Sequence, residues 1–319
     1  MSQKKSQSQL FNSLRVFGQL RAELGLLFGA MCWGVIWYPY RLMNEAGISG
    51  LAASFYTYGI AIILASVFSF NYWRHQQKIS PSILWLSMVA GWTNIAYVLA
   101  IIDGEVMRVM LLFYLSPIWT MILAHFWLKE RTHLKGVGII LLALLGALVM
   151  LFDFAHAAQN LSAETWLAFL PFPKKTWEWI ALSSGFGFAL TNVMTRKSSH
   201  LSIHEKSFAV WIGVFVMSFL MLLILHQPIP AVKIFSTTQW LVMVLIALLL
   251  ISATVFVQYG VTQVPAMHAS VLFLFELVVA AIAAYWLANE TMQWNEWLGG
   301  SLIVLAGILS VTQMQESSA

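Results

Sequence analysis

One acidic residue stands out because it lies in the middle of an apolar stretch. The run from Ala266 to Glu290 is long enough to cross a bilayer, and Glu276 sits near its centre with no polar residue beside it. An ionised carboxylate in hydrocarbon is costly, so this group must face a polar cavity, find a cationic partner or carry a proton. Two interpretations follow. In the first, Glu276 has a functional role and binds a charged species or carries a proton. In the second, it is a protonated carboxyl that bonds a neighbouring helix for packing.

Two basic side chains lie near the ends of predicted spans. Arg108 follows Asp103 and Glu105 closely in the chain, so it either snorkels outward and pairs with one of these acids or binds a substrate carboxylate in a bidentate manner. His268 lies at the start of the Glu276 stretch, where it is either a proton relay or a local cap or surface group. The sequence leaves both pairs of interpretations open.

Aromatic side chains are dense inside the apolar runs. Trp33, Trp37 and Tyr40 recur at spacings of four and three, so they share one helix face. If that face lines a cavity, it offers stacking for planar substrates and cation–π contacts for ammonium groups; if it faces lipid, it is ordinary apolar surface. The other aromatic candidates inside the runs are Trp92, Tyr97, Tyr114, Trp119 and Tyr259.

Uncharged polar side chains also fall inside the runs. Asn94, Asn192 and Gln258 each need a hydrogen-bond partner in hydrocarbon, so we expect them to point into the bundle. Together with the aromatic residues and Glu276 they outline a central polar path.

The composition defines the class of protein that must position these residues. The 319 residues are 60% hydrophobic and 9% charged, which is typical of a multi-pass membrane protein. The net charge of +4 is modest, and no segment indicates a nucleic-acid partner. Cys32 is the only cysteine, so neither an intrachain disulfide nor a cysteine metal site is expected, and no cofactor is predicted.

Ten apolar runs indicate ten transmembrane helices. They divide into five before and five after a long connection, with most other connections very short, so successive helices are expected to be antiparallel neighbours. The predicted organisation is an N-terminal segment at 1–23, a first repeat at 24–153, a connecting loop at 154–176, a second repeat at 177–313 and a tail at 314–319. Within the first segment, Phe11 to Leu20 is either an interfacial helix or a flexible tail.

The distribution of basic residues predicts the orientation. If the N-terminus is cytoplasmic, twelve Lys and Arg residues fall on the cytoplasmic side and four on the outer side, which satisfies the positive-inside rule. Both termini are then cytoplasmic and the connecting loop is periplasmic.

The two halves show an internal repeat when one is laid over the other at a fixed offset. Phe113 then meets Phe273, Ser116 meets Glu276, and Arg108 meets His268. Because each half has five spans, an odd number, the second half must enter the membrane from the opposite side. This is an inverted-topology repeat, in which a midplane site is opened alternately to either side.

The sequence resembles a known family. The five-plus-five layout, Trp33-Gly34, Pro117 before Lys129-Glu130, and Glu276 before Asn289-Glu290 are similar to the EamA domains of the drug/metabolite transporter superfamily. The family usually has a proline directly after the glutamate of the ninth span, where this chain has Leu277. Pro117 therefore predicts a break in the fourth span, whereas Leu277 gives no such signal in the ninth. The resemblance implies export or exchange of a small metabolite, amino acids among them.

No enzyme signature is found. The chain has no Walker A loop, no His-Glu-x-x-His motif and no Gly-x-Ser-x-Gly elbow, and an intramembrane hydrolase would need a nucleophile–base pair that the sequence does not present. The prediction is a secondary transporter, working as a monomer in a bacterial-type inner membrane, that moves an amino acid or related amine and is coupled to protons through Glu276. The alternatives are uptake of an organic cation through an aromatic cage, and a non-transporting membrane scaffold or sensor.

Overall fold

The computed structural model describes residues 2–75, 80–104, 106–131, 133–152, 173–289 and 291–318, and within these ranges every regular element is a helix. The elements in chain order are α1 Ser2–Glu45, α2 Gly50–Phe68, α3 Phe70–His75, α4 Pro81–Asp103, α5 Val106–Phe113, α6 Ser116–Leu123, η1 Ala124–Leu128, α7 Leu134–Leu151, α10 Thr176–Lys197, α11 Ile203–Ile224, η2 Val232–Ile234, α12 Thr237–Gln263, α13 Ala266–Phe273, α14 Phe275–Leu287 and α15 Trp294–Ser318. The predicted connecting loop lies mostly outside the described residues, as does Glu290.

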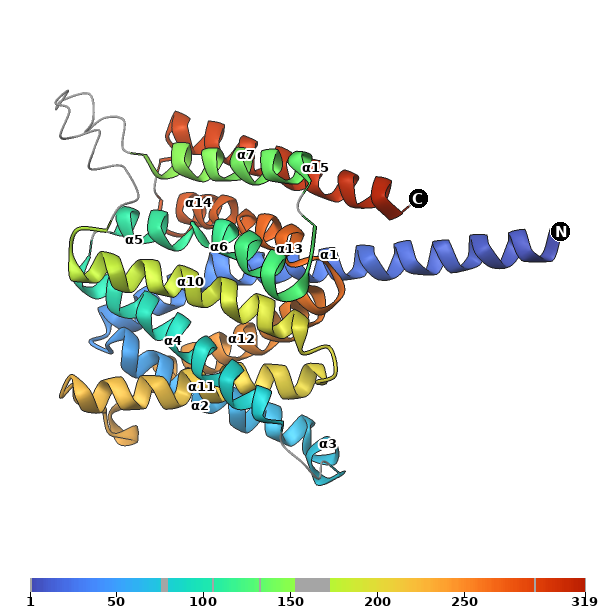
Figure 1. The fold of residues 1–319 in the computed structure, drawn as a ribbon. Helices are drawn as coiled ribbons and strands as arrows, with labels where there is room; N and C mark the ends of the chain where they lie inside the picture. The colour runs from blue at the N-terminus through green and yellow to red at the C-terminus, as the bar shows by residue number, and fades with distance from the viewer. Residues whose placement is uncertain are drawn as a thin grey trace.

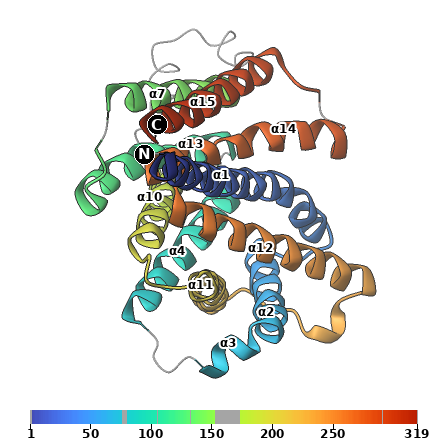
Figure 2. The ribbon, with the colours of Figure 1, turned by 90° about the vertical axis from the view of Figure 1, so that its right-hand side faces the viewer.

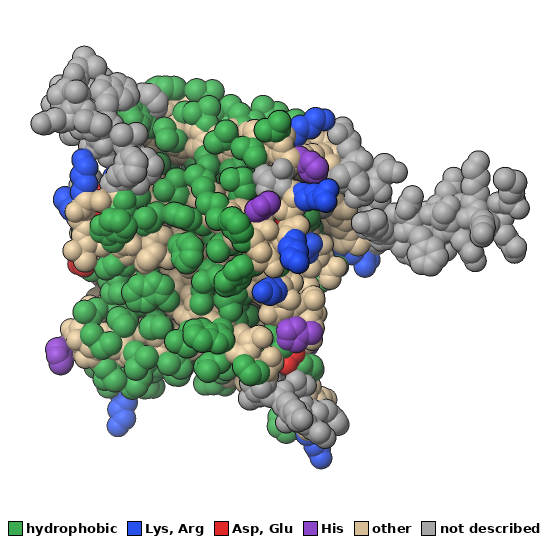
Figure 3. Space-filling view, viewed as in Figure 1, with side chains coloured by type: hydrophobic (Ala, Val, Ile, Leu, Met, Phe, Trp, Pro, Cys, Tyr) green, Lys and Arg blue, Asp and Glu red, His purple; other side chains and the backbone are tan. Residues whose placement is uncertain are grey.

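The helices of the bundle are apolar, and hydrophobic side chains cover the flank seen in Figure 3. In the described part of the chain, nine helical segments are long and apolar enough to cross a membrane, and they coincide with nine of the ten predicted runs. The sixth run forms the 22-residue helix α10, which carries more polar side chains, so the count of ten spans stays a prediction. The flank between the two ends of the bundle is covered by hydrophobic side chains, whereas Lys, Arg and His side chains gather at the ends (Figure 3).

Both chain termini lie at one end of the bundle, which we call the termini end (Figure 1). This is the end that the distribution of basic residues predicts to be cytoplasmic. The opposite end, where α5 and α10 begin, is called the far end. The helix α1 is continuous from Ser2 to Glu45 and extends beyond the bundle, so the segment from Phe11 to Leu20 is helical but is not separated from the first span (Figure 1).

The internal repeat is visible in the breaks of the fourth and ninth spans. The fourth span is divided between α5 and α6 around Tyr114, close to Pro117, as the sequence predicts. The ninth span is divided at Leu274, the position that the repeat aligns with Tyr114, although no proline follows it. Around Leu274 the backbone forms tighter i to i−3 bonds, Leu274 to Val271 (3.2 Å) and Leu277 to Leu274 (3.1 Å). The break is thus a property of both halves and does not depend on proline.

The ends of the two broken spans also correspond. Lys129 after the fourth span and Asn289 after the ninth have left-handed backbones, with φ of 56° and 54°. The repeat aligns these two residues with each other, and each precedes a glutamate. A left-handed residue ends a helix because it directs the chain away from the axis. The motif that carries the family resemblance is therefore a helix stop.

Close helix crossings join the halves. The helices α7 and α15 lie side by side at one face of the bundle (Figure 2). A Cβ on Gly146 would lie 2.8 Å from the Gly299 carbonyl oxygen, and a Cβ on Gly299 would lie 2.4 Å from the Gly146 oxygen. Only glycine permits this approach.

Candidate functional site

Glu276 lies where the broken ninth span begins again. It is in the first turn of α14, the end of a helix that favours negative charge. Its side chain keeps some accessible surface although it is deeply enclosed by neighbouring atoms, so that surface faces the interior of the bundle. The backbone of Glu276 is held by α1, since a Cβ on Gly34 would lie 2.7 Å from the Glu276 carbonyl oxygen. The Trp33-Gly34 pair thus brings the first span directly against the acidic residue.

Two tyrosines from the other half accompany the carboxyl group. The side chain of Tyr114, at the break of the fourth span, lies close enough to Glu276 to interact with its carboxyl group. Tyr97 of α4 lies close enough to interact with it electrostatically. The two breaks of the inverted repeat therefore meet through Glu276 and Tyr114. We call Glu276, Tyr114 and Tyr97 the Glu276 group.

Four aromatic rings form a layer beside this group, defined by Trp33, Phe113, Phe188 and Phe273. Trp33 of α1 packs on Phe188 of α10 (5.9 Å between ring centroids) and on Phe273 of α13 (5.6 Å). Phe188 also contacts Phe113 of α5 (5.4 Å) and Phe273 (5.2 Å). Phe113 reaches Tyr97 (5.0 Å) and so links the layer to the Glu276 group. Sequence reasoning did not select Phe113 or Phe188, although the alignment of Phe113 with Phe273 was a signal.

The candidate residues nearer α2 form a separate group. The Tyr40 hydroxyl is hydrogen-bonded to Thr57 of α2 (3.1 Å), and Tyr58 of α2 donates to Asn94 of α4 (3.4 Å). Tyr40 therefore packs against α2, while Trp33, on the same predicted face of α1, packs against α10 and α13. Both ends of this face of α1 are therefore covered by other helices, and the face is not a single stripe exposed to lipid.

Three other tryptophans lie outside the Glu276 group. Trp92 donates from Nε1 to Ser183 Oγ (3.2 Å), which ties α4 to α10. Trp119 packs edge-on against Phe186 (5.7 Å). Trp37 packs edge-on against its neighbour Tyr38 (5.7 Å). Trp92 and Trp119 thus pack between helices, whereas the contact of Trp37 is with its neighbour on α1.

Two buried amides lie on α10 and α12. Asn192 and Gln258 are each 4% exposed, as expected of polar groups that point into the bundle. Asn192 Nδ2 and Gln258 Oε1 have no hydrogen-bond partner among the described residues. Tyr259, beside Gln258, is half-buried and packs in the same apolar cluster as Trp33 and Phe188. A buried donor and a buried acceptor without partners are the pattern expected of groups that bind water or a ligand.

Arg108 forms a buried ion pair at the far end. Its Nε donates to Glu178 Oε1 at 3.0 Å, and Glu178 also accepts from the backbone N–H groups of Lys174 and Lys175. The Arg108 and Glu178 side chains are only 10% and 7% exposed. Sequence reasoning considered Asp103 and Glu105 as partners and missed Glu178, which belongs to the other half of the chain, because local spacing carries no information about contacts across the bundle.

His268 forms a buried cluster at the termini end with Glu23 of α1 and Ser310 of α15. Its Nε2 lies 3.2 Å from Glu23 Oε1, and its Nδ1 is hydrogen-bonded to Ser310 Oγ. His268 is thus neither a surface group nor a local cap. Serine, histidine and carboxylate are the residue types of a hydrolase triad, but here the two ring nitrogens are exchanged, with Nδ1 at the serine and Nε2 at the carboxylate. All three are at most 6% exposed, however, so the triad is closed to any substrate in this conformation.

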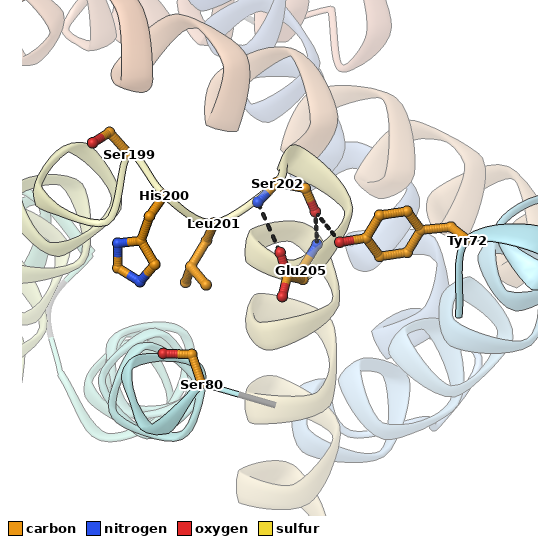
Figure 4. Close-up of a pocket in the computed structure, with 7 residues that line it drawn as sticks. All are labelled: Tyr72, Ser80, Ser199, His200, Leu201, Ser202 and Glu205. Carbon is orange, nitrogen blue, oxygen red and sulfur yellow. Dashed lines mark hydrogen bonds between the residues drawn. The ribbon is translucent and has the colours of Figure 1, made fainter. Parts of the chain in front are cut away.

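A surface hollow of about 500 Å³ at the termini end lies apart from these groups (Figure 4). Ser202 begins α11 there, with its N–H donating to Glu205 (2.8 Å) and its hydroxyl bonded to Tyr72 (2.8 Å). These polar groups cap a helix and join α3 to α11. This hollow among the described residues is thus a helix junction and contains no residue of the Glu276 group.

The fold and the paired breaks define a class, the helical membrane proteins built from two equivalent halves. The model of the EamA-like transporter family matches residues 20–152 and 175–312, one match for each half. The chain therefore belongs to the EamA-like transporter family and is a multi-pass membrane transporter of the drug/metabolite type. A solved structure described only as "Crystal structure of protein" has the same fold, with a TM-score of 0.67 and 16% identity over 92% of this chain and 98% of that one. No curated protein sequence matches the chain.

Proposed function

We propose that the protein moves a small amine-bearing metabolite, an amino acid or related amine, out across a bacterial-type inner membrane by alternating access. The observation that carries the proposal is the Glu276 carboxyl group, accompanied by Tyr114 and Tyr97 at the junction of the two broken spans. A carboxylate beside aromatic rings binds ammonium groups through charge and cation–π attraction. The same carboxyl group is the candidate for carrying a coupling proton.

Two buried contacts are proposed as the closures of the pathway. At the far end, Arg108 of the fourth span holds Glu178 of α10. At the termini end, His268 of the ninth span holds Glu23 of α1. In each case the fourth helix of one half holds the first helix of the other half. In the proposed cycle these contacts break in turn, and both are formed in the conformation described here.

The layer of four aromatic rings favours a second candidate, uptake of an organic cation. Rings from α1, α5, α10 and α13 adjoin the acidic group, an arrangement suited to a cation without a carboxylate. Direction separates the two candidates, because an exporter and an importer differ in the side from which substrate drives flux.

Flux in liposomes tests the proposal. The purified protein is reconstituted, and uptake of radiolabelled amino acids and amines is followed under a pH gradient. Glu276→Gln should abolish substrate-dependent flux, because it removes the charge while keeping the size of the side chain. Glu45→Gln is the matched control, since Glu45 is 57% exposed and pairs with neighbouring Arg41. Normal flux in Glu276→Gln would overturn the role of this residue, and no flux of any candidate by wild type would favour a scaffold or sensor.

A further inference from the structure

A lysine is fully buried in the termini half of the bundle. Lys206 has 0% exposed surface and lies in the first turn of α11. A buried ammonium group carries a large desolvation cost, and the start of a helix is its positive end, which disfavours a cation. Such a placement needs a compensating anion or a functional reason.

The partners of Lys206 do not supply that compensation. Its Nζ donates to the Thr262 hydroxyl at 2.9 Å. The neighbouring Glu205 attracts it electrostatically, but the Glu205 carboxylate is hydrogen-bonded to the Ser202 N–H. Among the described residues no carboxylate forms an ion pair with Lys206. An ammonium group has three donors, and here one protein acceptor is provided.

A second cation meets the same threonine. Arg196 of α10 donates from Nη1 to the Thr262 carbonyl oxygen (2.8 Å) and from Nε to Glu130 (2.8 Å). The Glu130 carboxylate also accepts from the Ala266 N–H (3.1 Å). Of the two cations at Thr262, Arg196 is thus paired with a carboxylate and Lys206 is not.

The unpartnered amides lie one turn further into the bundle. The helices α10 and α12 run in the same direction, because the short connections make α11 antiparallel to both. Asn192 precedes Arg196 by four positions and Gln258 precedes Thr262 by four, so each amide is displaced by about 6 Å along its helix from the cation level. One further turn before Asn192 is Phe188, which belongs to the aromatic layer beside the Glu276 group.

We propose that Lys206, with Asn192 and Gln258 one turn deeper, is a binding site for the carboxylate of the substrate, between the termini end and the aromatic layer. The proposal rests on the transport function above and narrows the substrate to molecules that carry a carboxylate. The Lys206 ammonium and the Asn192 amide donate to the carboxylate oxygens, and the Gln258 oxygen accepts from an N–H group of the same ligand. These three residues are at most 4% exposed, so the ligand enters when the termini closure opens and then uses the hydrogen-bonding groups that the described residues leave without partners.

Three probes of one carbon skeleton test this inference. Binding of L-leucine, 4-methylpentanoate and 3-methylbutylamine to the purified full-length protein is measured by isothermal titration calorimetry. Lys206→Gln should weaken binding of the two carboxylates about 10-fold or more, as expected for a lost charge-assisted contact, and leave binding of the amine unchanged. Lys206→Met is the second variant, because an apolar residue of similar length removes the buried charge without leaving a polar group unpaired.

Controls separate this site from the central one. Lys197→Gln should alter nothing, because Lys197 is exposed at the same end of α10, over the Trp127 ring at 5.2 Å. Glu276→Gln should weaken binding of the amine. Unchanged binding of the amine in this variant would contradict the Glu276 proposal and leave the carboxylate site standing. The carboxylate site is overturned if wild type binds neither carboxylate, or if both Lys206 variants bind them as wild type does.

Discussion

The two proposed closures occupy equivalent positions in the inverted repeat but differ in chemistry. The repeat aligns Arg108 with His268, and each holds a glutamate on the first helix of the other half. At the far end the partner of Glu178 is a permanently charged guanidinium. At the termini end the partner of Glu23 is a histidine that also bonds Ser310, and this pair is ionic only when the histidine is protonated.

The two closures occupy symmetric positions in the fold, but the contacts that hold them differ in strength. Glu178 is bound by a guanidinium and two backbone N–H groups, whereas Glu23 is bound by an imidazole and by Gln19 (3.2 Å). The guanidinium and its carboxylate are both ionised, whereas an unprotonated imidazole brings no charge of its own to the contact. We therefore expect the far closure to be the harder to open, which would bias the resting protein toward exposure at the termini end.

Breaking the far pair should have the largest effect. Arg108→Gln leaves the buried Glu178 carboxylate without its cation, so the free energy of unfolding should fall by about 3–5 kcal/mol. Reversible unfolding in mixed micelles measures it. The double variant Arg108→Gln/Glu178→Gln should recover much of the loss, since no lone charge remains. Arg41→Gln, in an exposed pair with Glu45, should change stability by about 0.5 kcal/mol or less. An Arg108→Gln loss as small as that of Arg41→Gln would show that the far pair contributes nothing.

Breaking the termini cluster should cost less. His268→Leu removes the bonds to Glu23 and Ser310 and leaves both buried, so we expect a loss of about 1–3 kcal/mol. The same unfolding assay applies, with Ser310→Ala as a milder variant that keeps the Glu23 contact. A loss equal to or greater than that of Arg108→Gln would reverse the proposed order of the two closures.

A comparable effect on stability is expected at the contact between α1 and the Glu276 backbone. Gly34→Ala places a methyl group 2.7 Å from the Glu276 oxygen and 2.8 Å from Val279 Cβ, so it should cost about 1–3 kcal/mol and lower flux. Gly138→Ala is the control, because nothing lies within 4 Å of its Cβ position, and it should be neutral or stabilising. Equal effects of the two substitutions on melting and flux would show that the Gly34 contact is not important.

The sequence predicted the features that depend on period and length. Apolar runs identified the membrane-crossing helices, Pro117 marked the break in the fourth span, and the alignment of the two halves paired Phe113 with Phe273. The break at Leu274 was not predicted, because no proline or other local breaker marks it in the sequence. Glu23 was placed in an N-terminal segment, yet it is buried in a continuous helix.

Sequence reasoning failed mainly to identify contacts between residues on different helices. Glu178 and Lys206 lie near the ends of helices, where charged residues normally contact water, and only the three-dimensional packing encloses them. The face carrying Trp33 and Tyr40 was correctly grouped by period, but period does not reveal that its two ends contact different helices.

Thiol accessibility at the centre of the bundle tests alternating closure most directly. Ser116→Cys, at the position equivalent to Glu276, is introduced into a Cys32→Ser background and exposed to a membrane-impermeant thiol reagent from either side of oriented vesicles. With Glu178→Gln added, the thiol should react from the far side; with Glu23→Gln added, it should react from the termini side. Reaction from the same side in both variants, or from neither side in both, would contradict the account.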